Sequence, residues 1–214
     1  MIDPASMAFV STLLALPVAF TIDPAAPLLV FGLALRAGAI HDPILAGPQF
    51  AGFASDGFTA AAAVFYFLHA AADKIPLCAH LFDALGLIGK PLAVALLGFW
   101  VQGKLGPAAP LHWIALAAIL AGGVPATLAL QTLRAKVRLG ASVASLGTLH
   151  PMISTMDNVA GAGLSWLAFT HPGAALAVIA PAAVVLWLAM RGLVRLARRG
   201  AGRMVSPARR NPLP

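Results

Sequence analysis

Residues 111–133 read LHWIALAAILAGGVPATLALQTL, and this stretch decides the fold class. It contains no Asp, Glu, Lys or Arg. An α-helix rises about 1.5 Å per residue, so about 20 apolar residues cross the roughly 30 Å hydrocarbon core of a bilayer. The stretch is therefore predicted to be a transmembrane helix.

The composition of the whole chain points the same way. Of its 214 residues 60% are hydrophobic and 10% are charged, and the mean hydropathy is +0.90. Soluble domains carry about 25% charged residues. An outer-membrane barrel would instead alternate apolar and polar residues in segments of about 10, and the sequence shows no such alternation. We predict an all-α, polytopic transmembrane helical bundle of about six spans, as a single domain over residues 1–190.

Two proline pairs interrupt this apolar sequence. Asp23-Pro24 and His150-Pro151 each end one segment and suit the first turn of the next helix. We predict broken or re-entrant helices at both places. Segments 7–22 and 25–40 are then either two spans or one broken span. Paired interruptions of this kind are typical of transport sites, where half-helix ends face the solute inside the bilayer.

A short helix is expected between two further prolines. Residues 77–89 follow Pro76 and precede Lys90-Pro91, and their leucines recur at helical spacing. We predict that this segment lies flat in the membrane interface, with Lys74 and Lys90 near the headgroups.

The basic residues predict the orientation. Seven arginines follow residue 190, whereas residues 1–190 carry seven basic and seven acidic side chains. Because Lys and Arg favour cytoplasmic loops, the tail 191–214, partly disordered, and a loop at 134–138 should both lie in the cytoplasm. The chain is then a multi-pass protein of the inner (plasma) membrane.

The tail is also expected to contact anionic lipid headgroups. It lacks the interleaved aromatic residues and the fold of a nucleic-acid-binding segment, so we predict no nucleic-acid partner. The arginines assigned to lipid contact are Arg191, Arg195, Arg198, Arg199 and Arg203.

A family resemblance rests on two motifs. The first is Ala72-Asp73-Lys74-Ile75-Pro76, followed by Asp83 and Lys90-Pro91; the second is the stretch 150–158, HPMISTMDN. Together they resemble a bacterial membrane family, the domain of unknown function 4126, whose second motif reads Asn-Pro-x-x-Ser-x-x-Glu-Asp. The chain departs from the family pattern at His69, Ala79 and the pair 157–158. The resemblance implies a membrane protein and points to the matching residues, but it implies no activity.

Ionisable residues beside apolar segments are the candidate functional residues, because a charge inside a bilayer needs a partner or a polar cavity. The candidates for a substrate or ion pathway are Asp23, Asp73, Lys74, Asp83, His150, Ser154 and Asp157. Asp73 and Asp157 are expected to share a central cavity, with Lys74 and Arg138 as the nearest basic partners. An isolated carboxylate there would stay protonated. The alternative is structural: Asp73 caps the next helix while Lys74 reaches the headgroups.

Metal and hydrolase chemistry are weighed and set aside. His69 with Asp73, and His80 with Asp83, share helix faces and could hold a divalent metal, yet the spacing matches no established motif and His–Asp hydrogen bonds explain it. Ser154, His150 and Asp157 form a hydrolase-like triplet that would still need an oxyanion site. We predict no enzyme activity, cofactor or metal.

The sequence leaves the function itself open. One hypothesis is a small-solute or lipid transporter that uses buried aspartates. The alternative is a structural or accessory membrane protein without a substrate. Homo-oligomerisation is compatible with either.

Overall fold

The structure is a computed structural model that describes residues 4–105, 111–145 and 148–182, together with residues 184, 188 and 191. Every regular element within these residues is a helix, so the predicted all-α class is confirmed. The elements are α1 (Pro4–Ile22), α2 (Ala26–Arg36), η1 (Pro48–Ala54), α3 (Asp56–Ala72), α4 (Pro76–Leu105), α5 (Leu111–Ala117), η2 (Ala118–Gly123), α6 (Val124–Ala144) and α7 (His150–Thr170).

The chain divides into two compact units, Met1–Leu176 and Ala177–Pro214. The first unit contains all the elements named above. A further apolar helix, Pro172–Ala182, begins in the first unit and ends in the second. The single domain over residues 1–190 stays a prediction.

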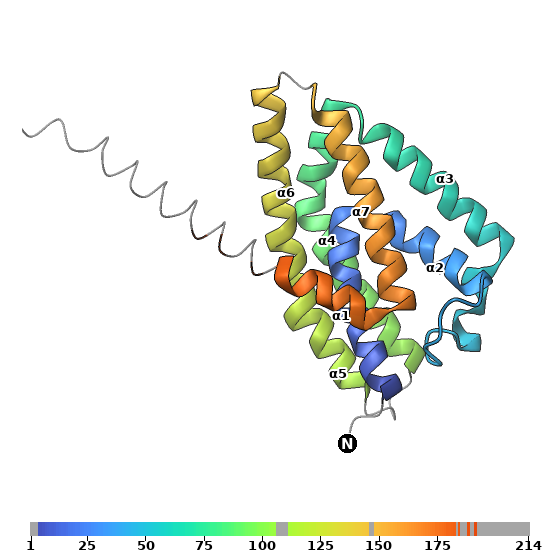
Figure 1. Cartoon of the computed structure of the whole chain (residues 1–214). Helices are drawn as coiled ribbons and strands as arrows, with labels where there is room; N and C mark the ends of the chain where they lie inside the picture. Colours follow the sequence, from blue (N-terminus) through green and yellow to red (C-terminus); the bar gives the residue numbers. More distant parts are fainter. Residues whose placement is uncertain are drawn as a thin grey trace, which may run out of the picture. The chain divides into compact units, whose positions relative to one another are not determined.

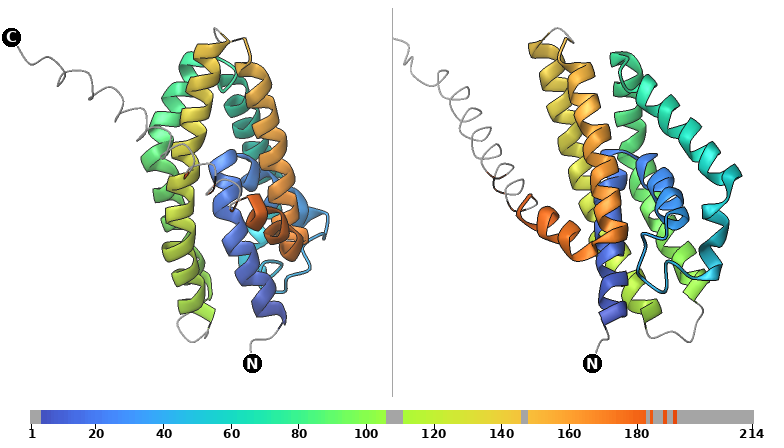
Figure 2. Two further views of the ribbon diagram at one scale, coloured as in Figure 1. Left: turned by 60° about the vertical axis from the view of Figure 1, so that its left-hand side comes forward. Right: turned by 45° about the vertical axis from the view of Figure 1, so that its right-hand side comes forward.

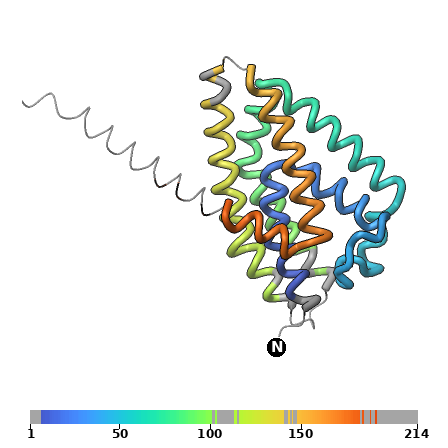
Figure 3. Tube along the Cα trace, in the orientation of Figure 1, coloured from blue at the N-terminus to red at the C-terminus, as the bar shows by residue number. Residues whose placement is uncertain are grey.

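Long helices run in alternating directions through the first unit. α3 and α4 meet in a turn at one end, and α6 and α7 meet at the same end (Figures 1 and 2). α5, η2 and α6 follow one another without interruption from residue 111 to residue 144. α1 enters from the opposite end and packs against α4, α6 and α7, as the trace in Figure 3 shows. Its Phe9, Leu13 and Ala19 are fully enclosed, so α1 is the core helix of the unit.

The predicted break at Asp23-Pro24 is present. α1 ends at Ile22 and α2 begins at Ala26. Asp23 caps the second helix, since its Oδ1 accepts hydrogen bonds from the backbone N–H groups of Ala25 at 2.9 Å and Ala26 at 3.2 Å. α2 has 11 residues, about 16 Å of helix, which is too short to cross a bilayer alone.

The second predicted break has a different character. α7 does begin at His150, with Pro151 in its first turn. Yet the interruption lies where two long helices meet at the end of the unit (Figure 1). It is a connecting turn, so the prediction of a broken helix there is wrong. Residues 134–138 were also expected to form a loop, but they lie within α6.

The predicted interfacial helix 77–89 is wrong as well. α4 is one helix of 30 residues that continues through Lys90-Pro91. Pro91 has no N–H to donate to the carbonyl of Leu87, four residues before it, yet the helix continues. Lys90 consequently lies in the middle of α4 and not at its end.

Among the described residues, one helix is long and apolar enough to cross a membrane, Pro76–Trp100 within α4. The pair η1 and α3, bent by 58°, would count as a second if it forms one broken span. Length and composition therefore leave the predicted six spans unconfirmed. Only 22% of the apolar window in α4 is buried, whereas the core helix of a soluble protein is mostly buried.

Large apolar side chains cover the outside of α3 and α4, while many polar side chains are buried beside the apolar core. Large exposed side chains on α3 and α4 include Val64, Phe67, Leu68, Leu77, Leu85, Ile88 and Leu96. Buried polar side chains include Asp23, Asp73, Asp83, Lys90, Gln131, Arg138, His150 and Ser154. Soluble proteins show the reverse distribution, because Lys, Arg and Asp are almost never buried there unless paired.

Candidate functional site

The site is built around Asp73, which directly follows α3. Its backbone N–H still donates to the carbonyl of His69 at 2.9 Å, so the chain leaves the helix with a fixed orientation. The side chain turns inward and is almost fully buried. Pro76 then starts α4, which holds Asp73 in the turn between two helices.

Arg138 of α6 meets this carboxylate with both ends of its guanidinium. Nη1 donates to Oδ1 of Asp73 and Nη2 donates to Oδ2, each at 2.7 Å. This bidentate geometry is the strongest form of an Arg–carboxylate pair. The Arg138 side chain is only 1% exposed. A charge so deeply buried is stable only when it is paired.

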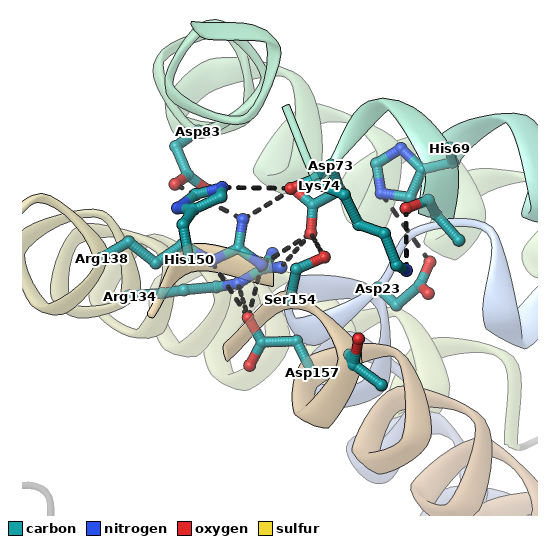
Figure 4. A network of polar contacts seen from close by, with 12 residues as sticks. Asp23, His69, Asp73, Lys74, Asp83, Arg134, Arg138, His150, Ser154 and Asp157 are labelled. Atoms are coloured by element: carbon teal, nitrogen blue, oxygen red, sulfur yellow. Dashed lines mark hydrogen bonds and ion pairs between the residues drawn. The ribbon is translucent and has the colours of Figure 1, made fainter. Parts of the chain in front are cut away.

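A second carboxylate, Asp157 of α7, joins the same guanidinium. Its Oδ2 accepts from Nη2 of Arg138 at 2.6 Å and from Nε of Arg134 at 3.1 Å. Nη2 of Arg134 also lies 3.7 Å from Oδ2 of Asp73. Figure 4 shows the four side chains converging from the α3–α4 turn, α6 and α7. The four residues, here called the ion-pair network, tie these three elements together.

The ionisation of Asp73 follows from its partners. Burial raises the pKa of this carboxyl, but the hydrogen bonds and charge of Arg138, the Ser154 hydroxyl and the charge of Arg134 outweigh burial and hold the pKa well below its usual range. The expectation that a carboxylate here stays protonated is therefore wrong for Asp73. The expectation treated it as isolated, whereas two guanidinium groups face it.

α7 adds two polar contacts to Asp73. The Ser154 hydroxyl donates to Oδ2 of Asp73 at 2.9 Å. Nε2 of His150 lies 3.1 Å from the Asp73 backbone carbonyl. The Ser154 proton thus points to Asp73 and not to the imidazole, so the hydrolase-like arrangement of Ser154, His150 and Asp157 does not form.

A second polar group, here called the Lys90 group, lies around the middle of α4. The ammonium of Lys90 donates to the Thr21 carbonyl at 2.7 Å and to Oε1 of Gln131 at 3.0 Å. The side-chain amide of Gln131 in turn donates to the Asp83 carbonyl at 3.1 Å and to its Oδ1 at 3.3 Å. Gln131 therefore connects Lys90 to Asp83 across the α4–α6 contact.

The two polar groups meet at the C-terminal end of α1. Nη1 of Arg134 donates to the same Thr21 carbonyl at 3.1 Å, so one carbonyl oxygen accepts from two cationic side chains. The last carbonyls of a helix lack partners within the helix and carry partial negative charge. Asp83 makes another connection, since its Oδ2 lies 3.8 Å from Nη1 of Arg138.

Several buried oxygens in this region accept no hydrogen bond. They are Oδ2 of Asp23, Oδ2 of Asp83 and Oδ1 of Asn158. Nε2 of His69 lies 3.9 Å from Oδ1 of Asp23. Unsatisfied buried oxygens cost free energy, and the Asp23 oxygen lies at the α1–α2 break.

The structure brings most of the predicted residues together. Asp73, Asp157, Asp83, Ser154 and His150 share one region with Arg138, while Asp23 lies beside His69. Lys74 does not join them: its side chain is exposed, and its Nζ lies 3.4 Å from the Ala70 carbonyl.

The metal-ligand candidates do not assemble into a metal site. The His80 ring lies 5.7 Å from that of His150, and His69 faces Asp23 instead of Asp73. In the described part of the chain no three His, Cys, Asp or Glu side chains are placed to hold a metal ion.

Sequence reasoning missed Lys90, Gln131 and Arg134 as site residues. A signal for the latter two was present: Thr127, Gln131, Arg134 and Arg138 recur at the spacing of one helix face. The prediction divides this stripe, with Thr127 and Gln131 in the span 111–133 and the two arginines in a loop at 134–138. Lys90 lies seven residues after Asp83, on the same face of α4, but Pro91 concealed that continuity.

Comparison with known proteins gives one match. The family model described as a domain of unknown function, DUF4126, matches residues 10–195. No curated protein matches the chain. No solved structure matches it either.

Proposed function

Since the chain belongs to the family of the domain of unknown function DUF4126, a name that carries no activity, we propose a function from the structure itself. The protein is an integral membrane protein that moves a small solute or ion through its buried polar interior. The observation that carries this proposal is the inverted distribution of polarity: paired charges inside, large apolar side chains outside. Ionisable residues within membrane helices commonly mark such pathways.

The broken helix supports transport over a purely passive role. α1 lies at the centre of the unit and ends before Asp23, whose Oδ2 is buried without a hydrogen bond. Half-helix ends inside a bilayer are typical of transporter binding sites. The ion-pair network links the α3–α4 turn, α6 and α7 at one end of the unit, so it can act as a closure that opens when these elements separate.

A structural or accessory role is the second candidate. It is favoured by the bidentate pairing of Asp73 with Arg138, in which both carboxylate oxygens and both Nη groups are already engaged. In that case the ion-pair network only fixes the helices.

The test is reconstitution of the full chain in vesicles of anionic and zwitterionic lipid. Proton movement is followed with an enclosed pH-sensitive dye, and lipid movement with a labelled lipid that an external reductant bleaches. The transport proposal expects a rate above that of protein-free vesicles and a changed rate for Asp157→Asn. The matched control is Asp56→Asn, whose exposed carboxylate pairs with Arg36 outside the ion-pair network. Rates equal to protein-free vesicles in both assays would favour the structural role.

The placement in the cell is part of the same proposal. We expect about six crossings of the inner membrane, with the broken pair α1–α2 counted once, and a cytoplasmic C-terminus because of its arginines. Residues 192–214 lie outside the described residues, and Arg191 is helical. Activity from a C-terminal reporter that functions only outside the cytoplasm would contradict this orientation.

Anionic lipids are the expected partners of the tail. Replacing Arg195, Arg198, Arg199 and Arg203 by Gln should lower binding to anionic vesicles while the helical core keeps its thermal transition. Unchanged binding would contradict the lipid contact.

A further inference from the structure

Lys90 occupies an unusual place for a lysine. It is the fifteenth of the 30 residues of α4, the one helix among the described residues whose length and composition alone suit a membrane crossing. Its residue exposure is 9%. A lysine at the end of a span can extend its amine to the headgroups, but a lysine at the midpoint cannot reach either face. Its charge must be accommodated inside the protein.

The surroundings of Lys90 stabilise an ammonium poorly. Its two hydrogen-bond acceptors, the Thr21 carbonyl and the Gln131 amide oxygen, are both neutral. In the described part of the chain no ion pair within 4.0 Å includes Lys90. The guanidinium of Arg134 binds the same Thr21 carbonyl, so a second positive charge lies close by. A like charge and burial both disfavour the protonated form of an amine.

The charged groups around Lys90 come from every neighbouring element. Arg134 and Arg138 of α6 oppose its charge. Asp83 of α4 and Asp23 at the α1–α2 break favour it, but both are engaged elsewhere: Asp83 with Gln131 and Arg138, and Asp23 with the N-terminus of α2 and His69. Arg138 differs from Lys90, because two carboxylates bind its guanidinium directly.

We propose that Lys90 is the proton-carrying group of this protein, and that the moving ion of the proposed transport is a proton. The inference rests on the proposed function. An N–H bond of the ammonium breaks, its electron pair stays on Nζ, and the proton passes to a water molecule. Uptake from the other side of the membrane reverses the step. No net charge remains on Lys90 in between.

Release of the proton would loosen the centre of the unit. The charged amine holds the end of α1 to α4 through Thr21, and α6 to α4 through Gln131. Hydrogen bonds from a charged donor are stronger than those from a neutral one. The neutral amine therefore binds both oxygens less tightly, which couples proton release to movement of the broken helix.

Protonation can be observed without any flux. The protein is labelled with ¹⁵N-lysine in detergent, and the Nζ resonances of Lys90 and of the other lysines, Lys74, Lys104 and Lys136, are followed against pH. The Lys90 resonance is the one missing from Lys90→Arg. It should show loss of the Lys90 proton at a lower pH than the resonances of the other lysines do. The proposal would be overturned if Lys90 kept its proton up to the same pH as the other lysines.

Flux then tests the role. Proteoliposomes with an imposed pH gradient should lose proton movement, to the level of empty vesicles, with both Lys90→Arg and Lys90→Met. Lys90→Arg is decisive, because arginine keeps the positive charge and the donors but does not release its proton. The matched control is Lys136→Arg on the exposed side of α6, which should keep the wild-type rate.

The two proposals fail in distinguishable ways. Wild-type protein that moves neither protons nor lipid contradicts transport, and the Nζ titration then decides separately whether Lys90 exchanges a proton. Proton flux that survives in folded Lys90→Arg contradicts the role of Lys90 alone.

Discussion

Two buried aspartates show that burial alone does not set the protonation state of a residue. Asp73 has two arginines and a hydroxyl around it, and its pKa is held low despite burial. Asp42, in the loop between α2 and η1, accepts only the backbone N–H groups of Ile44 and Leu45. Burial raises the pKa of Asp42, and these two hydrogen bonds offset the effect only in part. The identity of the partners decides the direction.

Removing one member of the Asp73–Arg138 pair should be costly. Asp73→Asn and Arg138→Gln each leave a buried charge incompletely paired, which typically costs about 3–5 kcal/mol. The double variant should cost less than the sum, because neither charge is then left behind. The free energy of unfolding in mixed micelles, measured for all four proteins of the cycle, checks this. Additive losses would contradict a direct ion pair.

Acid should weaken this pair only late. The pKa of Asp73 is lower in the folded state, so its contribution is fully present above the ordinary aspartate pKa of about 3.9 and is lost as pH falls through the lower folded value. The stability difference between wild type and Asp73→Asn should therefore hold constant from neutral pH to about pH 4. A difference that already fades between pH 7 and pH 5 would contradict the assignment.

Asp42→Asn should behave in the opposite way. Because the pKa of Asp42 is raised on folding, its contribution is present below the ordinary aspartate pKa and is lost as pH rises through the raised value. Asparagine keeps Oδ1 as the acceptor for both backbone groups and carries no charge. The variant should be as stable as wild type or more stable at neutral pH, and the gain should shrink in acid. Thermal unfolding across pH measures this, and a loss of stability at neutral pH would contradict it.

Among the helices, the sequence predicts the break at Asp23-Pro24, which local chemistry determines. It does not predict the continuity of α4 through Lys90-Pro91, which depends on packing. Asp23-Pro24 ends α1 because aspartate caps the following helix and proline suits its first turn. Lys90-Pro91 also looks like an end, yet α4 continues through it. The difference lies in tertiary contacts, since Gln131 and Thr21 hold Lys90 inside the unit. These partners are distant in sequence, so local patterns could not reveal them.

The same reason explains the errors about the site. The aspartates, His150 and Ser154 were predictable as polar residues in apolar surroundings. The helix face that carries Arg134 and Arg138 was detectable from spacing alone. Arg138 was expected as a partner of Asp73 and Asp157, and the structure places it on both carboxylates. The contacts of Arg134 with the same two carboxylates depend on how α3, α6 and α7 pack, which local patterns do not encode.

The approach of α7 to the α1–α2 break depends on Gly161. A Cβ atom at this position would lie 2.7 Å from Cβ of Asp23. Gly161→Ala should therefore destabilise the fold by about 1–3 kcal/mol through overpacking. Gly163→Ala on the same helix meets nothing within 4 Å and should stabilise it by up to about 1 kcal/mol. Unfolding of the two variants in detergent compares them, and equal effects would contradict the close contact.

At the scale of the first unit, charged groups balance one another inside an apolar exterior. Asp23, Asp73, Asp83 and Asp157 face Lys90, Arg134 and Arg138, so three positive charges offset most of the four negative ones. Removing one member of an ion pair from such an interior leaves an uncompensated buried charge and is destabilising. The exposed leucines and phenylalanines of α3 and α4 would be an aggregation hazard in water but match lipid.

Spin-label accessibility tests whether the outer face of α4 meets lipid while Lys90 faces protein. The only cysteine, Cys78, is first replaced by serine. Leu85→Cys, Ile88→Cys, Leu92→Cys and Leu96→Cys are then labelled in vesicles, with Lys74→Cys at the exposed α3–α4 turn as reference. If this face meets lipid, the spin labels at the four α4 positions should be highly accessible to oxygen and poorly accessible to a water-soluble nickel chelate. Nickel accessibility as high as at residue 74 would place this face in water and contradict its contact with lipid.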